Sequence, residues 1–584
     1  MTLIALLPLA LATTGFDATA PEATFTGTEV ENLEGTVRLW SAIERLADPD
    51  RTLFGAGQYN SVTSWPSAAP WAPYIATCFG SATPHTSKFL LHVGPSSAIA
   101  SGTPILFVPG AADNGSRGFI TMAWHEDLLG RPVYAITFAH PHGDAFEQAE
   151  QVADAIARIR ERTGAAQVDV VAHSKGGIAA AIYASNSGGA SWSDSAYAAV
   201  GTEYRGDIRR LVLIATPIGG IDTAFRWPNA NYLALDTDET LSPSSWQAYY
   251  PYTTGNLYVS TDLRGQDFFA ADGDLFPGQR QLYARQDHEL PGSLPFLGAY
   301  AMQQDWYTTY EGGYGYYSYS EGVDAVVEAG GGVLDALAEN GLDPSVSLYV
   351  LAGNNPLMPN GSSDYATDLF GDAWAETGAL TLRQWGDIVS AAIGDGLVGV
   401  GVADEEIQGL VAGDVILGEI SGESDGLVFI ESATAGDRLT GRGATLVDTH
   451  TANLSHLDLL YASPITGDLL IQAGAADDDD AWMIAFGERY TEEDTIGLVE
   501  DWLADGGGDT GGDTGSVDTG GDTGVADTGA GGKDSGLLDE DDFGTMPSEL
   551  PEECGACNGA ASARGGGLAF LLASGLILRR RRNG

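Results

Sequence analysis

The fold is decided by the stretch Val168–Gly177, which reads VDVVAHSKGG. It begins as an apolar run, passes through a serine set among small residues, and continues into a segment rich in glycine and alanine. This order predicts a buried strand that turns sharply at Ser174 into a helix. Small residues are needed beside the serine because the strand and helix backbones approach closely there, and Ala172 takes the place of the more frequent first glycine.

Short apolar runs and amphipathic segments alternate around this stretch. Apolar residues recur at helical spacing over Asp144–Thr163, which predicts a helix between two strands. Strand–helix–strand units form right-handed crossovers, so we expect an α/β fold with a mostly parallel, doubly wound sheet. The predicted strands are Phe89–Val93, Pro104–Val108, Val133–Phe138, Val168–Ala172 and Leu211–Ala215, and sheet-like sequence returns at Ser347–Ala352, Asp414–Glu419, Leu427–Ile430 and Ala444–Asp448.

The segment from Ile221 to about Val333 breaks this alternation. It is rich in glycine and aromatic residues, and Trp306–Tyr319 alone contains seven aromatics. Such a segment indicates a large insertion into the sheet domain. One interpretation is a lid or cap that lines an apolar substrate pocket, and the other is an irregular, packed subdomain. The sequence favours neither over the other.

The turn at Ser174 has the pattern of a nucleophile elbow, in which a serine is exposed between a strand and a helix. The N-terminus of the helix favours negative charge, so it stabilises both the nucleophile and an oxyanion. A serine hydroxyl is a weak nucleophile at neutral pH. A histidine base, and an acid that orients the histidine, are therefore required.

The acid and the histidine are expected downstream of Ser174, in that order. Asp425 in the run SDGLV is the best acid, expected in a loop between two predicted strands, although a plain Asp-Gly β-turn would look the same. His456 in the run LSHLD is the best base because it follows shortly after and precedes the final apolar helix. His450 is its near rival and lies in a more polar stretch.

An oxyanion requires a pair of backbone N–H donors. The run Leu106–Ala111 ends a predicted strand upstream of the elbow, where this architecture carries its oxyanion loop. We therefore expect one donor to be the N–H of Ala111 and the other the N–H of Lys175, the residue after the nucleophile. An ordinary Pro-Gly turn is the alternative for the first. The Lys175 side chain is expected to face solvent.

These elements together resemble the bacterial, class 2-type lipases of the α/β-hydrolase superfamily. The residues that carry the resemblance are Phe107–Ala111, Val168–Gly177, Leu213–Pro217, Ser424–Val428 and Leu454–Leu460. The resemblance implies the α/β-hydrolase fold and a carboxylic ester hydrolase, either a triacylglycerol lipase or a carboxylesterase. It also implies Ser174, Asp425 and His456 as the catalytic triad, with a lipid or ester as substrate.

The same resemblance raises the question of a metal. In some of these lipases the aspartate two residues after the catalytic histidine binds a structural calcium ion, and Asp458 matches that position. No partner acid for Asp458 can be identified from the sequence. No other cofactor is expected.

Other functions stay open at this point. An acyltransferase, a thioesterase or an amidase uses the same three residues. A non-catalytic surface protein that binds ligands through the same fold is a further alternative, although such a protein has no reason to keep Ser174, Asp425 and His456 together.

The charge of the chain excludes some partners. The formal net charge is −53, and the tail explains little of it because Gly506–Glu553 holds only thirteen acids and one lysine. A domain this acidic repels phosphate backbones and anionic lipid, so we expect no nucleic-acid partner. The chain has only three cysteines, Cys78, Cys554 and Cys557, so no disulfide framework holds the main domain.

Both ends of the chain differ in composition from the sheet domain. Leu3–Ala12 is an apolar run that ends in an A-x-A pattern, which predicts an export signal over residues 1–20 in spite of the missing basic start. The α/β-hydrolase domain is expected over residues 21–505. Asp-Thr-Gly repeats follow over residues 506–553 without the apolar positions that would pack a coil, which predicts a disordered acidic linker.

Residues 554–584 are the predicted C-terminal tag. A cysteine pair precedes the apolar stretch Gly565–Leu578 and the arginine cluster Arg579–Arg582. The stretch is shorter than the roughly 20 residues that span a bilayer, and the arginines indicate its cytoplasmic side. The layout resembles the Cys-containing sorting tags of myxobacterial surface proteins. This implies an exported protein at the cell surface or outer membrane, with a plain tail anchor or extracellular release as alternatives.

Overall fold

A computed structural model shows how the sheet domain is built. It describes residues 16–26, 40–48, 77–81, 84–85, 87–111, 113–115, 118–141, 143–188, 192, 201–222, 277–286, 313–314, 319–320, 323–354, 425, 427–472 and 493–504. The chain divides into two units, residues 1–510 and 511–584, and every described residue belongs to the first.

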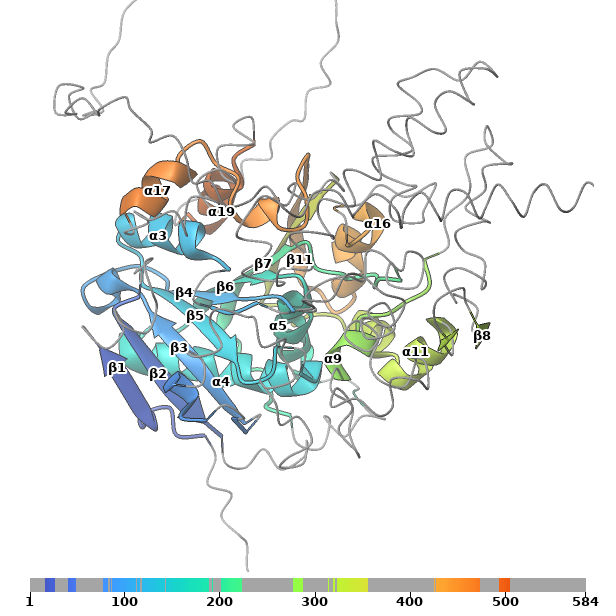
Figure 1. Cartoon of the computed structure of the whole chain (residues 1–584), viewed down its shortest axis with the longest axis horizontal. Coiled ribbons are helices and arrows are strands. Elements are labelled where there is room, and N and C mark those ends of the chain that lie inside the picture. The colour runs from blue at the N-terminus through green and yellow to red at the C-terminus, as the bar shows by residue number, and fades with distance from the viewer. Residues whose placement is uncertain are drawn as a thin grey trace, which may run out of the picture. The chain divides into compact units, whose positions relative to one another are not determined.

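Nine strands form one sheet within the described ranges, in the order β1-β2-β3-β5-β4-β6-β7-β10-β11 (Figure 1). Strands β1, β2 and β3 pair antiparallel, β3 is antiparallel to β5, and all later neighbours are parallel. The strands are β1 (Ala23–Thr26), β2 (Ala42–Ala47), β3 (Lys88–Val93), β4 (Ile105–Val108), β5 (Val133–Phe138), β6 (Val168–His173), β7 (Ile208–Ile214), β10 (Ser347–Gly353) and β11 (Thr445–Ala452), and a separate pair is β8 (Gly313–Tyr314) with β9 (Tyr319–Ser320).

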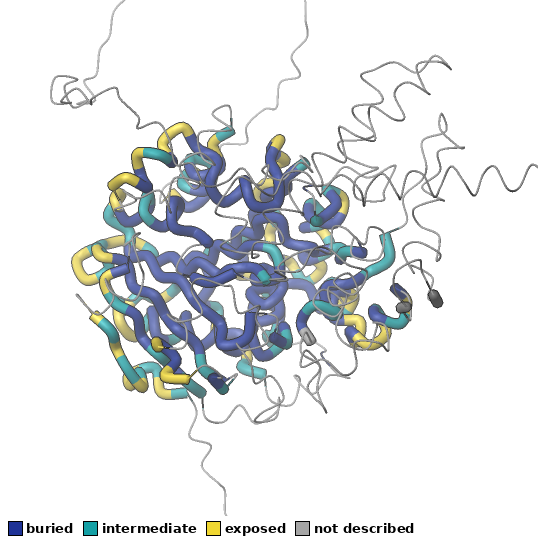
Figure 2. Tube along the Cα trace, in the orientation of Figure 1, coloured by how far each residue is buried: buried dark blue, intermediate teal, exposed yellow. Residues whose placement is uncertain are grey.

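Helices cover both faces of the sheet. Side chains alternate along a strand, so Ile105 and Phe107 of β4 join one apolar cluster while Leu106 and Val108 join the other. The first cluster includes residues of α3, α17 and α19, and the second includes residues of α4, α5 and α12. The central strands are accordingly buried along their length (Figure 2).

The helices in this part of the chain are α3 (Ile120–Leu128), α4 (Ala145–Thr163), α5 (Lys175–Ser185), α9 (Pro277–Arg280), α11 (Val323–Gly330), α12 (Val333–Asn340), α16 (Ile430–Ala433), α17 (Thr466–Gln472) and α19 (Thr495–Leu503), with short 3₁₀ turns η2 (Pro95–Ala98), η8 (Ala435–Leu439) and η9 (Asp458–Leu460). None of the helices described is long and apolar enough to cross a bilayer.

Helix α4 shows why the predicted helix forms where it does. The Asp144 carboxylate accepts from the backbone N–H groups of Phe146 at 2.8 Å and Glu147 at 3.3 Å, which caps the first turn. Gly164 ends the helix with φ 72°, a left-handed conformation that glycine adopts without strain. The predicted helix Asp144–Thr163 is thus confirmed.

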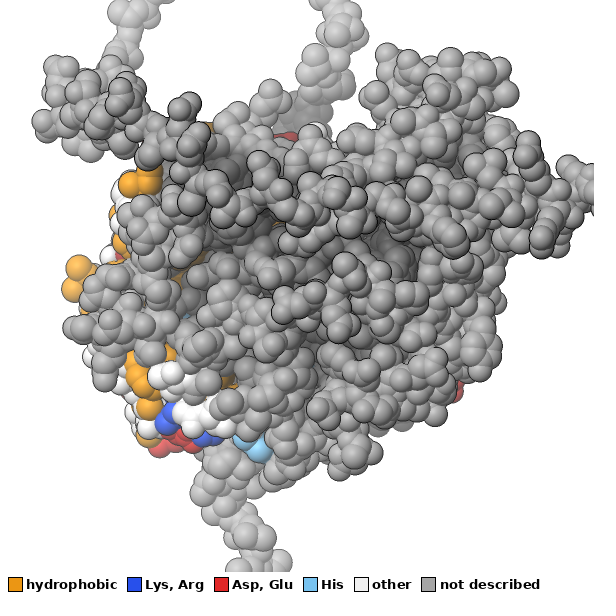
Figure 3. All heavy atoms as spheres, viewed as in Figure 1, with side chains coloured by type: hydrophobic (Ala, Val, Ile, Leu, Met, Phe, Trp, Pro, Cys, Tyr) orange, Lys and Arg blue, Asp and Glu red, His pale blue; other side chains and the backbone are white. Residues whose placement is uncertain are grey.

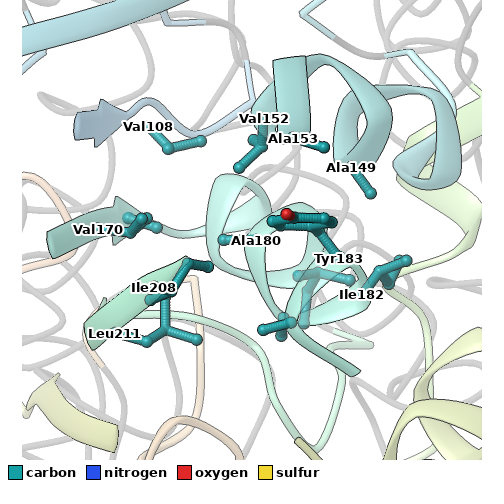
Figure 4. Packing of buried hydrophobic residues seen from close by; sticks show 14 of the residues in the cluster. Val108, Ala149, Val152, Ala153, Val170, Ala180, Ile182, Tyr183, Ile208 and Leu211 are labelled. Carbon is teal, nitrogen blue, oxygen red and sulfur yellow. The ribbon is translucent and has the colours of Figure 1, made fainter. Parts of the chain in front are cut away.

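Helix α5 packs against both the sheet and α4, and its alanines let the backbones come close (Figure 4). The Tyr183 hydroxyl donates to the Asp207 carboxylate at 2.6 Å, so its polar end is satisfied although the ring is buried. Burial of each large aliphatic side chain here contributes about 1.5–3 kcal/mol. The contacts in Figure 4 include Val108, Ala149, Val152, Ala153, Val170, Ala180, Ile182, Tyr183, Ile208 and Leu211.

The one acid in strand β6 is fully buried and ion-paired. Asp169 lies 2.8 Å from Arg131 Nη2 and 2.8 Å from Arg209 Nε, so two guanidinium groups offset the cost of burying its charge. Acidic and basic side chains also lie next to one another on the described part of the visible surface (Figure 3). An unusually acidic chain therefore places its few cations beside its acids.

The sheet confirms the predicted α/β class and most predicted strands. Leu427–Ile430 is not a strand, and that prediction is wrong: the Asp425 carboxylate accepts from the N–H groups of Leu427 and Val428, which turns the chain into α16. Strand β2 was not predicted because its buried Glu44, which pairs with Arg158 on α4, masks the apolar pattern.

Several predictions lie outside the described residues. They are the predicted strand Asp414–Glu419, most of the export signal, the greater part of the insertion 221–333, the linker 506–553 and the tag 554–584.

Candidate active site

Ser174 stands at a strained turn between β6 and α5. Its backbone has φ 50° and ψ −128°, and among the described residues Ala215 is the only other non-glycine with positive φ. Such a conformation is costly for a residue with a Cβ, so it persists only where the surroundings enforce it. The N–H of Ser174 donates to the Ile214 carbonyl at 2.8 Å, which fixes the turn to the neighbouring strand β7.

Glycines make this turn possible. A Cβ on Gly176 would lie 2.3 Å from the Pro109 carbonyl oxygen, and one on Gly177 would lie 2.0 Å from Thr216 Oγ1. Both distances are too short for any side chain, so the sequence after Ser174 must begin with residues that let helix and strands touch. The close packing at the elbow therefore requires the two glycines that follow Ser174 in the sequence.

Asp425 and His456 form a buried pair. Asp425 Oδ2 lies 2.8 Å from His456 Nδ1, and both side chains are at most 3% exposed. The other carboxylate oxygen accepts from the N–H groups of Leu427 at 3.0 Å and Val428 at 2.7 Å. These contacts hold the carboxylate so that it accepts from Nδ1, which leaves Nε2 of the imidazole able to take up a proton.

His173 connects this pair to the elbow. The residue directly precedes Ser174, and its Nε2 donates to the carbonyl oxygen of His456 at 3.0 Å. The two imidazole rings have centroids 4.6 Å apart. Burial, together with the charge that His456 can carry, keeps the pKa of His173 well below 6.5, so the ring stays neutral. The loop that bears His456 therefore lies against the end of strand β6, next to Ser174.

The rival histidine lies elsewhere. His450 is on β11, opposite Leu351 of β10, and its side chain is exposed. Of these two histidines, His456 is the one that bonds to Asp425.

The predicted oxyanion donors flank the serine. A Cβ on Gly110 would lie 2.9 Å from Ser174 Cβ, so the loop that follows β4 and contains Ala111 touches the elbow. Lys175 is the first residue of α5, where a backbone N–H has no carbonyl partner within its own helix. The two N–H groups belong to the two chain segments that border Ser174, an arrangement that suits an oxyanion hole.

The Lys175 side chain does not face solvent, and that expectation is wrong. It is 0% exposed, and its Nζ donates to Gln148 Oε1 on α4. Burial lowers the pKa of Lys175 from 10.5 to about 7, although the carboxylates of Asp144 and Glu147 oppose the shift. Helix α4 and the insertion cover the side chain, and a local reading of the sequence cannot show that.

Asp458, the calcium candidate, is fully buried and bonds to its own loop. Ser455 Oγ donates to Asp458 Oδ2 at 2.7 Å. No cluster of three or more histidine, cysteine or acidic side chains occurs in the residues described, so none supplies Asp458 with partner ligands.

Two residues near the site were not predicted as functional. His173 is part of the elbow motif, and its place beside the serine was the available signal. Gln148 lies in the first turn of α4, and only the fold brings it to Lys175.

No family model matches this chain, and no curated protein does. Among solved structures, the mature lipase BlEst2 of Bacillus licheniformis is similar at 15% identity, over 63% of this chain and 91% of that one, with a TM-score of 0.27. The siderophore hydrolase EstB of Aspergillus fumigatus is similar at 11% identity, over 71% and 94%, with a TM-score of 0.30. A carboxyl esterase of Bacillus coagulans is similar at 16% identity, over 46% and 76%, with a TM-score of 0.22.

Likeness this distant carries no argument about activity. The mostly parallel sheet, its helices on both faces, and a serine elbow that joins a central strand to a helix give this chain an α/β-hydrolase fold.

Proposed function

We propose that this protein is a serine hydrolase that cleaves carboxylic esters through an acyl-enzyme. The observation that carries the proposal is the buried Asp425–His456 pair, joined through His173 to the strained Ser174 turn. A nucleophile, a base and a group that orients the base are the parts that such chemistry requires.

In the acylation half, Ser174 Oγ attacks the ester carbonyl carbon while His456 Nε2 takes the hydroxyl proton. The carbonyl oxygen becomes an oxyanion, which accepts from the N–H groups of Ala111 and Lys175. The C–O bond to the alcohol then breaks, and the imidazolium returns its proton to the leaving alcohol. Asp425 stabilises the imidazolium through Nδ1.

In the deacylation half, water attacks the acyl carbon and gives its proton to His456. The bond to Ser174 Oγ breaks, Oγ takes the proton back, and the carboxylic acid leaves. Each half consumes and returns one proton at His456, so the enzyme ends unchanged.

The proposed substrates are esters that carry the acyl group of a lipid. The aromatic content of the insertion supports it, because aromatic side chains suit an apolar acyl chain. We further propose that the protein is exported and stays at the cell surface through its C-terminal tag, on the strength of the terminal sequence patterns alone.

Labelling with a fluorophosphonate tests the proposal directly. A serine activated in this way is expected to become covalently phosphonylated, and the labelled peptide should contain Ser174. A series of p-nitrophenyl esters from acetate to palmitate would then give the acyl preference. An unlabelled, folded protein would contradict the proposal and leave a binding protein, whereas label at Ser174 with turnover of only thioesters or amides would exclude the ester substrate.

A further inference from the structure

A buried lysine sits directly after the proposed nucleophile, and the esterase reaction makes no use of its side chain. The chain contains only three lysines, Lys88, Lys175 and Lys533, while most of its cations are arginines. Lys175 is 0% exposed. Burying an ammonium group is costly unless the group is ion-paired and hydrogen-bonded. The burial of this lysine therefore needs an explanation.

The lysine tail contacts the insertion. A Cβ on Gly278 would lie 2.4 Å from Lys175 Cε and 2.8 Å from its Nζ, and the same Cβ would lie 1.9 Å from the Gly143 carbonyl oxygen. Only a glycine fits there. The backbone of the insertion therefore rests directly on the end of the Lys175 side chain.

The amine is held by a hydrogen-bonded chain. Lys175 Nζ donates to Gln148 Oε1, and Gln148 Nε2 donates to the His140 carbonyl at 2.9 Å. The loop after β5 is thus joined to the elbow through α4. Since the amide of Gln148 donates at one end, its oxygen is left to accept from the lysine.

The same part of the insertion is bonded to the start of α4. Gln281 Oε1 accepts from the N–H of Ala145 at 2.7 Å, and Gln281 Nε2 donates to Asp144 Oδ2 at 2.8 Å. Further along, the N–H of Ala284 donates to the Ile221 carbonyl at 3.0 Å. Residues 277–286 are therefore seated on the sheet domain, with Lys175 beneath them.

We propose that Lys175 makes the docking of the insertion segment 277–286 on the sheet domain dependent on pH, because this segment covers its buried amine. The docking itself does not depend on the esterase proposal, although its value for turnover does.

The docking of the segment should depend on pH, and this dependence distinguishes the effect of Lys175 from that of the other contacts. The pKa of Lys175 is about 7 when buried and returns towards 10.5 when the segment opens and water reaches the amine. The open state then binds more protons between these values, so docking strengthens as pH rises from 7 towards 10. Asp144 and Glu147 act on the amine, and the other elements packed around it carry His140 and Arg280.

Limited trypsin digestion measures the docking, because Arg280 and Arg285 lie within the segment. Mass spectrometry would follow cleavage after these two arginines, at pH 7, 8 and 9, with cleavage after Arg438, whose side chain is 36% exposed, as the reference. Local cleavage reports the population of the open state when opening is fast.

Gly278→Ala is expected to raise this cleavage about tenfold or more at pH 8, and Lys175→Met is expected to lower it by a similar factor. The alanine methyl pushes the segment away from the sheet domain, whereas the methionine has no amine to take up a proton when the segment opens. Lys88→Met is the matched control, because Lys88 lies on β3 with its amine 2.7 Å from Glu22 and should leave the rate unchanged. Cleavage of the native protein should slow from pH 7 to 9 relative to the reference, and Lys175→Met should lose that trend.

Cleavage of Gly278→Ala at the native rate would overturn the proposal, even if Lys175→Met failed to fold. A native pH trend that persists in Lys175→Met would overturn it as well. Repeating the digestion in a Ser174→Ala background keeps this test separate from the esterase proposal, since docking should be unaffected there.

Discussion

His173 Nε2 donates to the carbonyl oxygen of His456 at 3.0 Å, so the residue before the proposed nucleophile fixes the backbone of the proposed base. A carbonyl can only accept, which assigns the hydrogen of this imidazole to Nε2. Its Nδ1 is buried beside Gly110 and has no hydrogen-bond partner in the described part of the chain. The elbow and the base are thus positioned by one hydrogen bond rather than independently.

Removing this bond should impair turnover more than binding. For His173→Leu we expect kcat on a short p-nitrophenyl ester to fall about 10- to 100-fold with KM nearly unchanged, as loss of a buried hydrogen bond implies. His173→Gln is the matched variant, because its amide can reach the same carbonyl and should retain most of the rate. Equal losses in both variants would contradict the positioning role.

The assignment of nucleophile and base is tested by three alanine variants. Ser174→Ala and His456→Ala should each lower kcat/KM by up to about 10⁶-fold without loss of fold, since triad members act as a unit. His450→Ala should stay close to native, because the His450 side chain is exposed on β11 and the histidine that bonds to Asp425 is His456. A severe loss in His450→Ala with a mild one in His456→Ala would move the base to the other histidine.

Asp425→Asn separates orientation from charge. The oxygen of the amide can keep the bonds from Leu427 and Val428, which turns the amide N–H₂ towards His456 Nδ1. The imidazole must then carry its hydrogen on Nε2 and cannot take the serine proton. We expect a loss in kcat of about 10⁴-fold. Asp448→Asn, which alters a carboxylate on β11 bonded to Trp502, is the control, and a comparable loss there would argue for general destabilisation.

The features predicted best from the sequence are those that short stretches of neighbouring residues determine. The elbow could be predicted because only small residues fit between α5, Pro109 and Thr216. The chain order of acid and histidine then pointed to Asp425 and His456, which the structure places in contact, while their catalytic roles stay predictions.

The features that escaped prediction depend on distant segments. Lys175 is buried because α4 and the insertion cover it, and no pattern around the serine records those segments. Strand β2 has a polar pattern because Glu44 finds its partner Arg158 more than a hundred residues away. The wrong strand after Asp425 has a local cause, since the side chain captures the backbone N–H groups that a strand would use.

Gly110→Ala should disable the site without unfolding the domain. The added Cβ would lie 2.9 Å from Ser174 Cβ and 3.0 Å from His173 Nδ1, so the loop after β4 and the elbow must move apart. We expect kcat to fall about 100-fold or more with a melting temperature close to native, because a misplacement of about 1 Å has effects of this size. Gly441→Ala, where the nearest atom to the added Cβ is 4.0 Å away, should be silent. Equal activity in both variants would place Gly110 outside the site.

Because His173 stays neutral in the folded protein, the free energy of unfolding should decrease as the pH falls below 6.5. Its pKa lies well below 6.5 in the folded protein, first because the ring is buried and then because of the charge on His456. The unfolded chain therefore binds more protons below pH 6.5, and the contribution of this residue to stability declines as pH falls from 6.5 towards the folded pKa. The slope can reach about 1.4 kcal/mol per pH unit. Urea unfolding of the native protein and of His173→Gln at pH 7 and pH 5 isolates the contribution of His173. The contributions of the other titratable groups cancel when the two proteins are compared. The free energy of unfolding should fall more for the native protein than for the variant, and parallel losses would mean that His173 takes up its proton in the folded state.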